Sequence, residues 1–208
     1  SLPWKENSDR VYGATDMNRW IFGTSKALSE HLLFSSARLY GIRTIIFRLS
    51  NIYGKFQKPS LVIPKMITSL LSTKKLQIYG NGLSMRSFTY IDDAVKAING
   101  LIKDKSIKMD VFNIGSNEET TIKDLAQKII TIIGDSNSTI EYINPQTKLG
   151  IQYEDLQRKI LDTSKIFKTI GWKATTSLLD GLNETIKWYK SNEEWWRMYL
   201  EKDTSSLL

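Results

Sequence analysis

The chain has 208 residues, a formal net charge of +7, 41% hydrophobic residues, a single histidine and no cysteine. This composition predicts a globular protein with a buried core, and it excludes disulfides, a thiolate nucleophile and cysteine-based metal sites. His31 alone cannot form an HExxH zinc site, and lysines interspersed with acidic residues do not favour a nucleic-acid partner.

The sequence also argues against a membrane protein. It contains no apolar run of about 18 residues or more, and no charged-then-apolar leader. We therefore expect no membrane partner, and the absence of cysteine favours a reducing, cytoplasmic location.

Helical and strand patterns alternate along the chain. After a polar opening stretch, apolar residues at helical spacing predict a helix over residues 18–40, and TIIFRLSN (44–51) predicts a buried parallel strand. Further elements are predicted, in chain order, as a helix at 63–72, a strand at 76–80, a helix at 91–103, a strand at 111–116, a helix at 121–133, a strand at 139–142, a small helix after Asp162 and a long helix at 178–200. This alternation predicts an α/β fold.

Two local features allow either a structural or a functional interpretation. Asp92 and Asp93 could bind a metal, but at the start of a helix they are expected to complement the helix dipole and cap it. Trp188, Trp195 and Trp196 could form a stacking platform, but their spacing favours helix packing.

The helix at 18–40 carries a candidate catalytic pair. Phe22 and Lys26 lie four residues apart in RWIFGTSKALSEH (19–31), so they project from one helix face. A tyrosine at position 22 would complete a YxxxK pair, in which the lysine lowers the tyrosine pKa and the phenolate acts as a base. Because phenylalanine cannot ionise, we expect the chain as written to be impaired or inactive as an enzyme.

Further motifs follow this pair in a fixed order. They are RLSNIYG (48–54), SLVIPKMI (60–67), LQIYGNGLSMRSFTYIDDAVKAI (76–98), VFNIGSNEETTIKDLA (111–126) and LQRKILDTSKIFKTIGWKATTSLLDGLNETIKWY (156–189). With the pair in the helix at 18–40, these motifs resemble the extended short-chain dehydrogenase/reductase family, the NAD-dependent nucleotide-sugar epimerases and dehydratases.

The resemblance implies the C-terminal part of a Rossmann-type parallel sheet plus a small α+β subdomain that binds the nucleotide sugar. Residues 1–54 and 88–134 are expected in the Rossmann-type domain, and residues 55–87 and 135–208 in the substrate subdomain and C-terminal helix. The glycine-rich cofactor fingerprint of such folds does not occur in this sequence. We therefore expect a C-terminal portion of a longer enzyme.

The resemblance also implies where the cofactor binds. NAD is the expected cofactor, with Lys26 on the nicotinamide ribose and Leu49 and Ser50 along the nicotinamide. Phe22 occupies the position of the catalytic tyrosine.

The expected substrate is a nucleotide sugar, and the resemblance implies three residues for its diphosphate. Asn51 would donate an amide hydrogen bond to it, and Arg86 and Arg158 would clamp it, because a planar guanidinium suits phosphate geometry. The base, expected to be uracil, would pack on Ser60, Leu61, Gln77 and Tyr79.

The function predicted first is a UDP-hexose 4-epimerase. Within the same family, a nucleotide-sugar 4,6-dehydratase and a UDP-glucuronate decarboxylase remain open as alternatives. A different class of function, a non-catalytic nucleotide-sugar-binding module, is also open because of Phe22. A homodimer is expected, since dimers through a helix pair are common in the resembled family.

Overall fold

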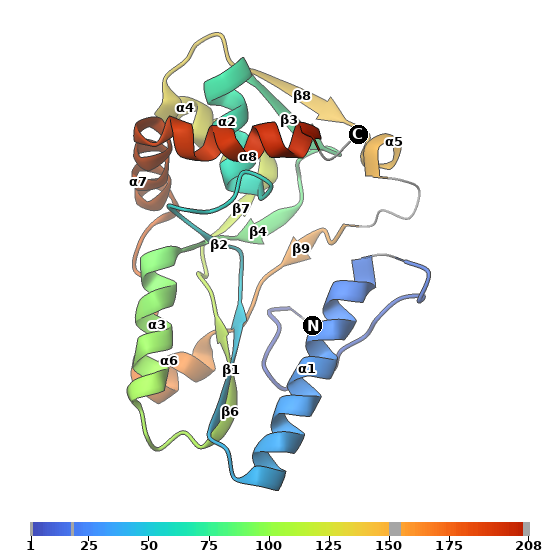
Figure 1. Ribbon diagram of the computed structural model, residues 1–208, viewed down its shortest axis with the longest axis vertical. Coiled ribbons are helices and arrows are strands. Elements are labelled where there is room, and N and C mark those ends of the chain that lie inside the picture. The colour runs from blue at the N-terminus through green and yellow to red at the C-terminus, as the bar shows by residue number, and fades with distance from the viewer. Residues whose placement is uncertain (1, 18, 150–154, 206–208) are drawn as a thin grey trace.

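The computed structural model describes residues 2–17, 19–149 and 155–205. They form two lobes joined by several crossing segments (Figure 1). In chain order the elements are α1 (Arg19–Tyr40), β1 (Thr44–Leu49), β2 (Ile52–Tyr53), α2 (Val62–Thr73), β3 (Lys75–Tyr79), β4 (Met85–Ser87), β5 (Thr89–Tyr90), α3 (Ile91–Lys103), β6 (Met109–Ile114), β7 (Glu119–Thr121), α4 (Ile122–Ile133), β8 (Thr139–Ile143), α5 (Pro145–Leu149), β9 (Arg158–Lys159), α6 (Ser164–Ile170), α7 (Leu178–Ser191) and α8 (Glu193–Ser205).

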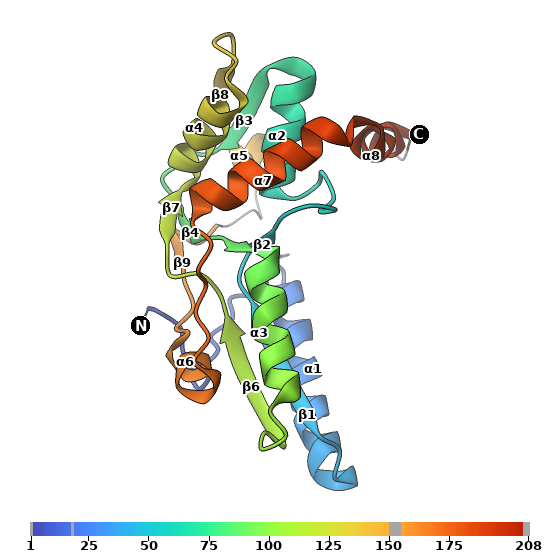
Figure 2. The ribbon, with the colours of Figure 1, turned by 90° about the vertical axis from the view of Figure 1, so that its left-hand side faces the viewer.

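The lower lobe of Figure 1 is built on the parallel pair β1–β6, which is in register from Thr44 with Met109 to Leu49 with Ile114. Helix α1 lies on one face of this pair, and α3 and α6 lie on the other (Figures 1 and 2). The core between the strands and α3 and α6 consists of Ala94, Ala97, Leu101, Ile107, Phe112, Ile114 and Ile166. This arrangement of helices on both faces of parallel strands is the α/β layering that the sequence predicts.

The upper lobe packs α2, α4, α7 and α8 around a second, larger core (Figure 1). Its parallel pair β3–β8 lies beside α2 and α4. The largest fully buried side chains of this core are Tyr53, Ile63, Ile67, Leu70, Leu76, Ile78, Leu125, Tyr189 and Trp196. A three-stranded sheet of order β7–β4–β9 lies between the lobes, with β7 antiparallel and β9 parallel to β4.

The two cores divide the chain differently from the predicted domain boundaries. Residues 88–134 were expected in the Rossmann-type part, yet α4 at the end of that range packs in the upper core. Conversely, Ile166 of α6 belongs to the lower core although residues 135–208 were expected in the substrate subdomain. The reason is that the amphipathic face of each helix can be buried by either lobe, and the chain crosses between the lobes more often than its motifs indicate.

One long helix over residues 178–200 was predicted, and this is wrong. The helix ends at Ser191, and α8 starts at Glu193. Asn192 has φ −129° and ψ 47°, outside the helical region. The break turns Trp196 into the core, where its indole donates to the carbonyl of Tyr189 at 2.9 Å. The structural interpretation of this tryptophan is thereby confirmed.

Asp92 and Asp93 lie in the first turn of α3, where their charges complement the helix dipole as predicted, but the prediction that they cap the helix is wrong. Tyr90 is the N-cap of α3 and has no capping side-chain hydrogen bond. The Asp93 carboxylate is buried and accepts from the backbone N–H of Thr175 at 3.0 Å and of Thr176 at 2.7 Å. Burial opposes its charged form, but the hydrogen bonds from Thr176 and Thr175 outweigh burial and lower the pKa of this carboxyl. Asp93 therefore anchors the segment that leads into α7.

Within the part of the chain that the structure describes, no helix is both long and apolar enough to cross a membrane.

Candidate functional site

Phe22 and Lys26 lie on one face of α1, as their spacing predicted. The Nζ atom of Lys26 is 5.2 Å from the centre of the Phe22 ring, and the phenylalanine is 71% exposed. This is cation–π geometry, in which the negative face of the ring attracts the ammonium group. Because the ring carries no ionisable group, the pair offers a fixed cation and no base.

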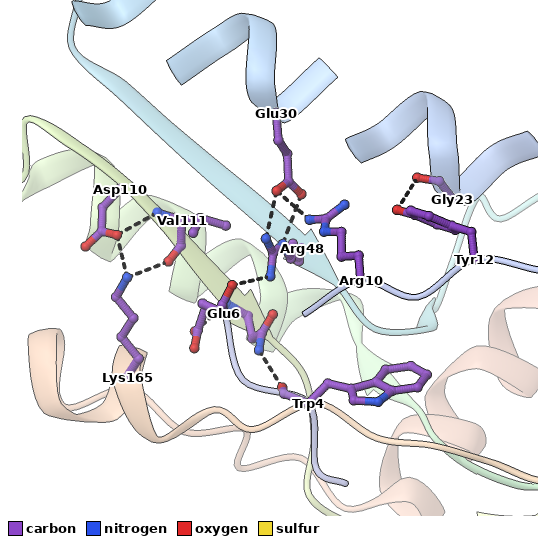
Figure 3. A network of polar contacts seen from close by, with 11 residues as sticks. Trp4, Glu6, Arg10, Tyr12, Gly23, Glu30, Arg48, Asp110, Val111 and Lys165 are labelled. Carbon is purple, nitrogen blue, oxygen red and sulfur yellow. Dashed lines mark hydrogen bonds and ion pairs between the residues drawn. The ribbon is translucent and has the colours of Figure 1, made fainter. Parts of the chain in front are cut away.

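Glu30, one helical turn beyond Lys26, ties α1 to the sheet (Figure 3). Its two carboxylate oxygens accept from Nε and Nη2 of Arg48 in β1 at 2.9 and 2.7 Å, and Arg10 Nη2 lies 2.5 Å away. Burial opposes the charged form of Glu30, but the hydrogen bonds from Arg48 and Arg10 outweigh it and lower the pKa of the carboxyl. This two-point contact fixes the rotation of α1 against β1, and so the direction in which Lys26 points.

The segment before α1 is attached to both α1 and β6 (Figure 3). The Tyr12 hydroxyl donates to the carbonyl of Gly23 at 3.1 Å. In β6, the backbone N–H of Asn113 donates to the Glu6 carboxylate and its side-chain amide donates to the carbonyl of Trp4, both at 2.9 Å. These contacts hold the start of α1 in place relative to the sheet.

The carboxyl end of β1 combines an exposed and a buried side chain. Leu49 is 47% exposed, whereas Ser50 is fully buried and its carbonyl accepts from the Thr89 hydroxyl at 3.0 Å. Asn51 has φ 40°, a conformation that asparagine tolerates better than most residues, and its amide donates to the Ser87 carbonyl at 2.8 Å. The amide that was predicted to reach a diphosphate is thus engaged in the turn.

By the lengths of the two elements, Lys26 in α1 and the carboxyl end of β1 lie at a similar level of the lower lobe. Helix and strand run in opposite directions and are joined by a short turn at Gly41, whose φ is 65°. About 21 Å of helix separates Lys26 from Tyr40, and about 17 Å of strand separates Thr44 from Leu49. Lys26 and Leu49 are therefore close to level, at the edge of a parallel sheet where ligands bind in open α/β folds.

Arg86 and Arg158 lie on the neighbouring strands β4 and β9, although 72 residues separate them in sequence. The register pairs Arg158 with Met85, so strand alternation directs the two guanidinium groups to opposite faces of the small sheet. Arg86 Nη2 contacts both oxygens of Asp155 at 2.7 Å, while Nε and Nη2 of Arg158 each bond one oxygen of Glu119 at 2.6 Å. The two arginines are neighbours but do not form one clamp in this structure.

The residues predicted to hold the base lie around the start of α2 and the end of β3. Ser60 and Leu61 are exposed just before α2, and Lys65 in its first turns lies 5.5 Å from the centre of the Tyr79 ring. Gln77 is exposed on the same strand as Tyr79, and its amide donates to a carboxylate of β8 at 3.0 Å. The structure therefore places all four predicted residues in one region.

Sequence analysis did not single out Glu30, Glu119 and Asp155, the carboxylates that pair with arginines in and around the site. Glu30 lies inside the RWIFGTSKALSEH motif, four residues after Lys26, and that position was a usable signal. Asp155 and Glu119 left none, because they lie 69 and 39 residues from the arginines they contact. Among the residues that the structure describes, no group of three or more histidine, aspartate or glutamate side chains could hold a metal ion.

Comparison with known proteins identifies the family to which this chain belongs. Residues 5–115 match the NAD dependent epimerase/dehydratase family. The chain belongs to this family. The match covers the segment before α1, α1 itself, β1 and the carboxyl end of β6, which are the elements that form the region around Lys26 and Leu49.

Three relatives illustrate the range of the family. The chain is 34% identical over 194 residues to a UDP-N-acetyl-alpha-D-glucosaminuronate decarboxylase from Bacillus cytotoxicus, covering 92% of this chain and 60% of the relative. A dTDP-glucose 4,6-dehydratase from Streptomyces venezuelae, solved with NAD bound, is 27% identical with a TM-score of 0.82 over 96% of this chain and 58% of that chain. A UDP-glucose 4-epimerase from Thermotoga maritima, solved with UDP-glucose, is 28% identical with a TM-score of 0.73 over 83% and 54%.

These comparisons confirm the predicted family, its NAD dependence and the α/β, Rossmann-type fold class. The family includes dehydratases, epimerases and decarboxylases of nucleotide sugars. The chain spans between 29% and 60% of the length of eight curated relatives.

Proposed function

We propose that this chain carries the catalytic helix and the nucleotide-sugar subsite of an NAD-dependent enzyme that acts on C4 of a hexose linked to a nucleoside diphosphate. The observation that carries the proposal is the Lys26–Phe22 pair, held by Glu30 at the level where β1 ends. The 4-epimerisation of a UDP-hexose is the reaction predicted first from the sequence. The absence of cysteine supports a cytoplasmic setting.

The residues around the end of β1 fit a dinucleotide. An exposed lysine can donate to ribose hydroxyls, and exposed Leu49 offers an apolar surface to a flat ring. Buried Ser50 places the backbone beside that surface. When bound, NAD supplies the two-electron acceptor for C4 of the sugar.

The substrate would lie between the lobes. In this proposal Arg86 binds the diphosphate. The base binds further into the upper lobe, at Ser60, Leu61, Gln77 and Tyr79. Asn51 lies between the end of β1 and Arg86, because it connects β1 to β2 and donates a hydrogen bond to β4, the strand that carries Arg86. Because its side-chain amide donates to the Ser87 carbonyl, Asn51 shapes the turn beside the diphosphate.

A restored tyrosine tests the catalytic part of the proposal. Loss of a general base costs about 10²- to 10⁴-fold in rate, so Phe22→Tyr should raise turnover by a factor in that range. We would incubate the full-length protein with Phe22, with Phe22→Tyr, and with Phe22→Tyr combined with Lys26→Met, each in the presence of NAD, and follow UDP-glucose by nuclear magnetic resonance. Activity that is unchanged by Phe22→Tyr, or that survives loss of Lys26, would contradict the proposed roles.

The products separate three reactions. A C4 epimer indicates the epimerase, a 4-keto-6-deoxy sugar indicates the 4,6-dehydratase, and carbon dioxide from a UDP-glucuronate substrate indicates the decarboxylase. Similarity to the Streptomyces dehydratase, which has the higher TM-score of the two solved structures described above, favours the dehydratase as the second candidate. Similarity to the Bacillus enzyme keeps the decarboxylase as the third.

A non-catalytic nucleotide-sugar-binding module is the candidate from another class, and the phenylalanine at position 22 favours it. It predicts that UDP raises the melting temperature of the chain while NAD does not. A comparable shift with NAD alone would reject this candidate.

We also propose that the chain forms a homodimer through α1. The outer face of this helix carries four exposed apolar side chains at helical spacing: Ile21, Leu28, Leu32 and Leu39. A charge in their middle, Leu28→Lys, should shift the chain toward the monomer in sedimentation velocity. The matched control is Leu83→Lys, at a leucine that is similarly exposed at 57% but lies outside α1. Equal behaviour of the two variants would contradict the interface.

A further inference from the structure

The two arginines predicted to bind diphosphate are paired with carboxylates in different ways. Arg158 uses two nitrogens, Nε and Nη2, each on a separate oxygen of Glu119 at 2.6 Å. This is the fork geometry of a strong guanidinium–carboxylate pair. Arg86 instead contacts both oxygens of Asp155 with the single nitrogen Nη2, at 2.7 Å each. The Arg86 pair is therefore the one that a second oxyanion can replace more easily.

The positions of the two carboxylates also indicate that Asp155 is displaced more easily than Glu119. Glu119 belongs to β7, where the ladder pairs it with Ser87, and its side chain is only 19% exposed. Asp155 precedes β9, outside the paired residues, and its side chain is 41% exposed. The Arg86 side chain is nearly buried, at 12% exposure. Moving Asp155 away from Arg86 thus disrupts no sheet hydrogen bond, whereas moving Glu119 would strain β7.

Arg86 cannot be left without an anionic partner at low cost. A guanidinium group that is mostly removed from water needs a compensating charge, and losing its partner is strongly unfavourable. Arg86 also donates from Nη1 to the carbonyl of Met85 at 2.7 Å, which supplies a dipole and no charge. A negative group must therefore occupy the position of Asp155 whenever Asp155 leaves.

We infer that Asp155 is an internal competitor for the diphosphate site: the substrate diphosphate replaces the Asp155 carboxylate on Arg86, while Arg158 stays paired with Glu119. This inference rests on the proposed function, since it takes Arg86 as the diphosphate ligand. It assigns Asp155 as a residue that sets substrate affinity.

The test measures anion binding to the full chain by isothermal titration calorimetry, with UDP and with inorganic pyrophosphate as probes. Asp155→Asn keeps an oxygen that can accept the Leu156 N–H, now 2.9 Å from the carboxylate, and removes the charge. It should bind both probes about ten-fold more tightly than wild type, because the competing carboxylate is gone. Asp155→Glu, which keeps the charge, should bind close to wild type.

The matched control is Asp135→Asn. Asp135 also pairs with a cation, Lys74 at 3.0 Å, and also accepts a local backbone N–H, from Asn137 at 2.9 Å. The control therefore removes the same net charge at a site that does not touch either arginine, and its affinities should match wild type. Combining Asp155→Asn with Arg86→Met should abolish the gain in affinity.

The outcomes separate the competitor role of Asp155 from the proposed nucleotide-sugar function. If Asp155→Asn binds pyrophosphate no more tightly than wild type, or more weakly, the competitor role is wrong, and binding of UDP to wild type still supports the proposed function. If pyrophosphate binds more tightly to Asp155→Asn while UDP binds to neither protein, the competitor role holds and the nucleotide-sugar function is wrong. If neither probe binds any of the variants, both claims are rejected.

Discussion

Helices α1 and α7 are held in the fold by different forces. In α7, Leu182, Ile186 and Tyr189 are at most 2% exposed and belong to the upper core. In α1, only Ala27 and Ala37 are buried hydrophobic residues, and its larger apolar side chains face outward. What fixes α1 is the ion-pair network of Glu30 with Arg48 and Arg10 (Figure 3).

The orientation of α1 therefore depends on a directional contact, whereas that of α7 depends on apolar packing. Apolar packing is nondirectional and stabilises the upper lobe as a whole, whereas the two-point pair between Glu30 and Arg48 has a defined geometry. The helix that carries Lys26 is thus positioned by a directional contact that depends on ionisation. The two helices should therefore respond differently to substitution and to pH.

Truncating the core face of α7 should have the largest effect. Leu182→Ala removes a fully buried side chain and should lower the free energy of unfolding by about 3 kcal/mol, measured by urea denaturation. The control is Leu179→Ala on the same helix, at a leucine that is 50% exposed, which should stay within about 0.5 kcal/mol of wild type. Equal losses for the two variants would show that α7 does not depend on the core as described.

Neutralising the anchor of α1 should have a smaller and more local effect. Glu30→Gln leaves two arginines without their charged partner and should lower the free energy of unfolding by about 2 kcal/mol. Hydrogen exchange should accelerate in α1 and stay unchanged in α7. Glu193→Gln is the control, because its pair with Arg197 is exposed by about half on both sides and contributes little. Uniform acceleration across both helices would contradict a local anchor.

The pH dependence of the same variant should show the smallest effect. Glu30 has a folded-state pKa below its ordinary value of about 4.5. The unfolded chain therefore takes up this proton first, so the stabilisation is fully present above that value and is lost as pH falls below it. The difference in unfolding free energy between wild type and Glu30→Gln should be largest at neutral pH and shrink below about pH 4.5. A difference that stays constant across this range would mean that Glu30 acts through its shape and not through its charge.

Much of the fold and part of the site could be predicted from local pattern. The β-branched run ending at Leu49 forms a strand in parallel register with β6, as its composition predicts, and the spacing of Phe22 and Lys26 places them together whatever surrounds α1. The order of motifs indicated the family that the comparison confirms. All of these signals lie within a single element or a short motif.

The remaining features depend on contacts that no local pattern encodes. Sequence patterns were sufficient for the α/β class, for the placement of Phe22 and Lys26 on one helix face, and for the family. Only the tertiary structure decided that the helical pattern after Leu178 breaks at Asn192, and that Arg86 and Arg158 face opposite ways with separate carboxylates. The physical reason is that secondary structure follows from the spacing of neighbouring side chains, whereas burial of Trp196 and the pairing of Arg86 with Asp155 arise only when distant segments meet.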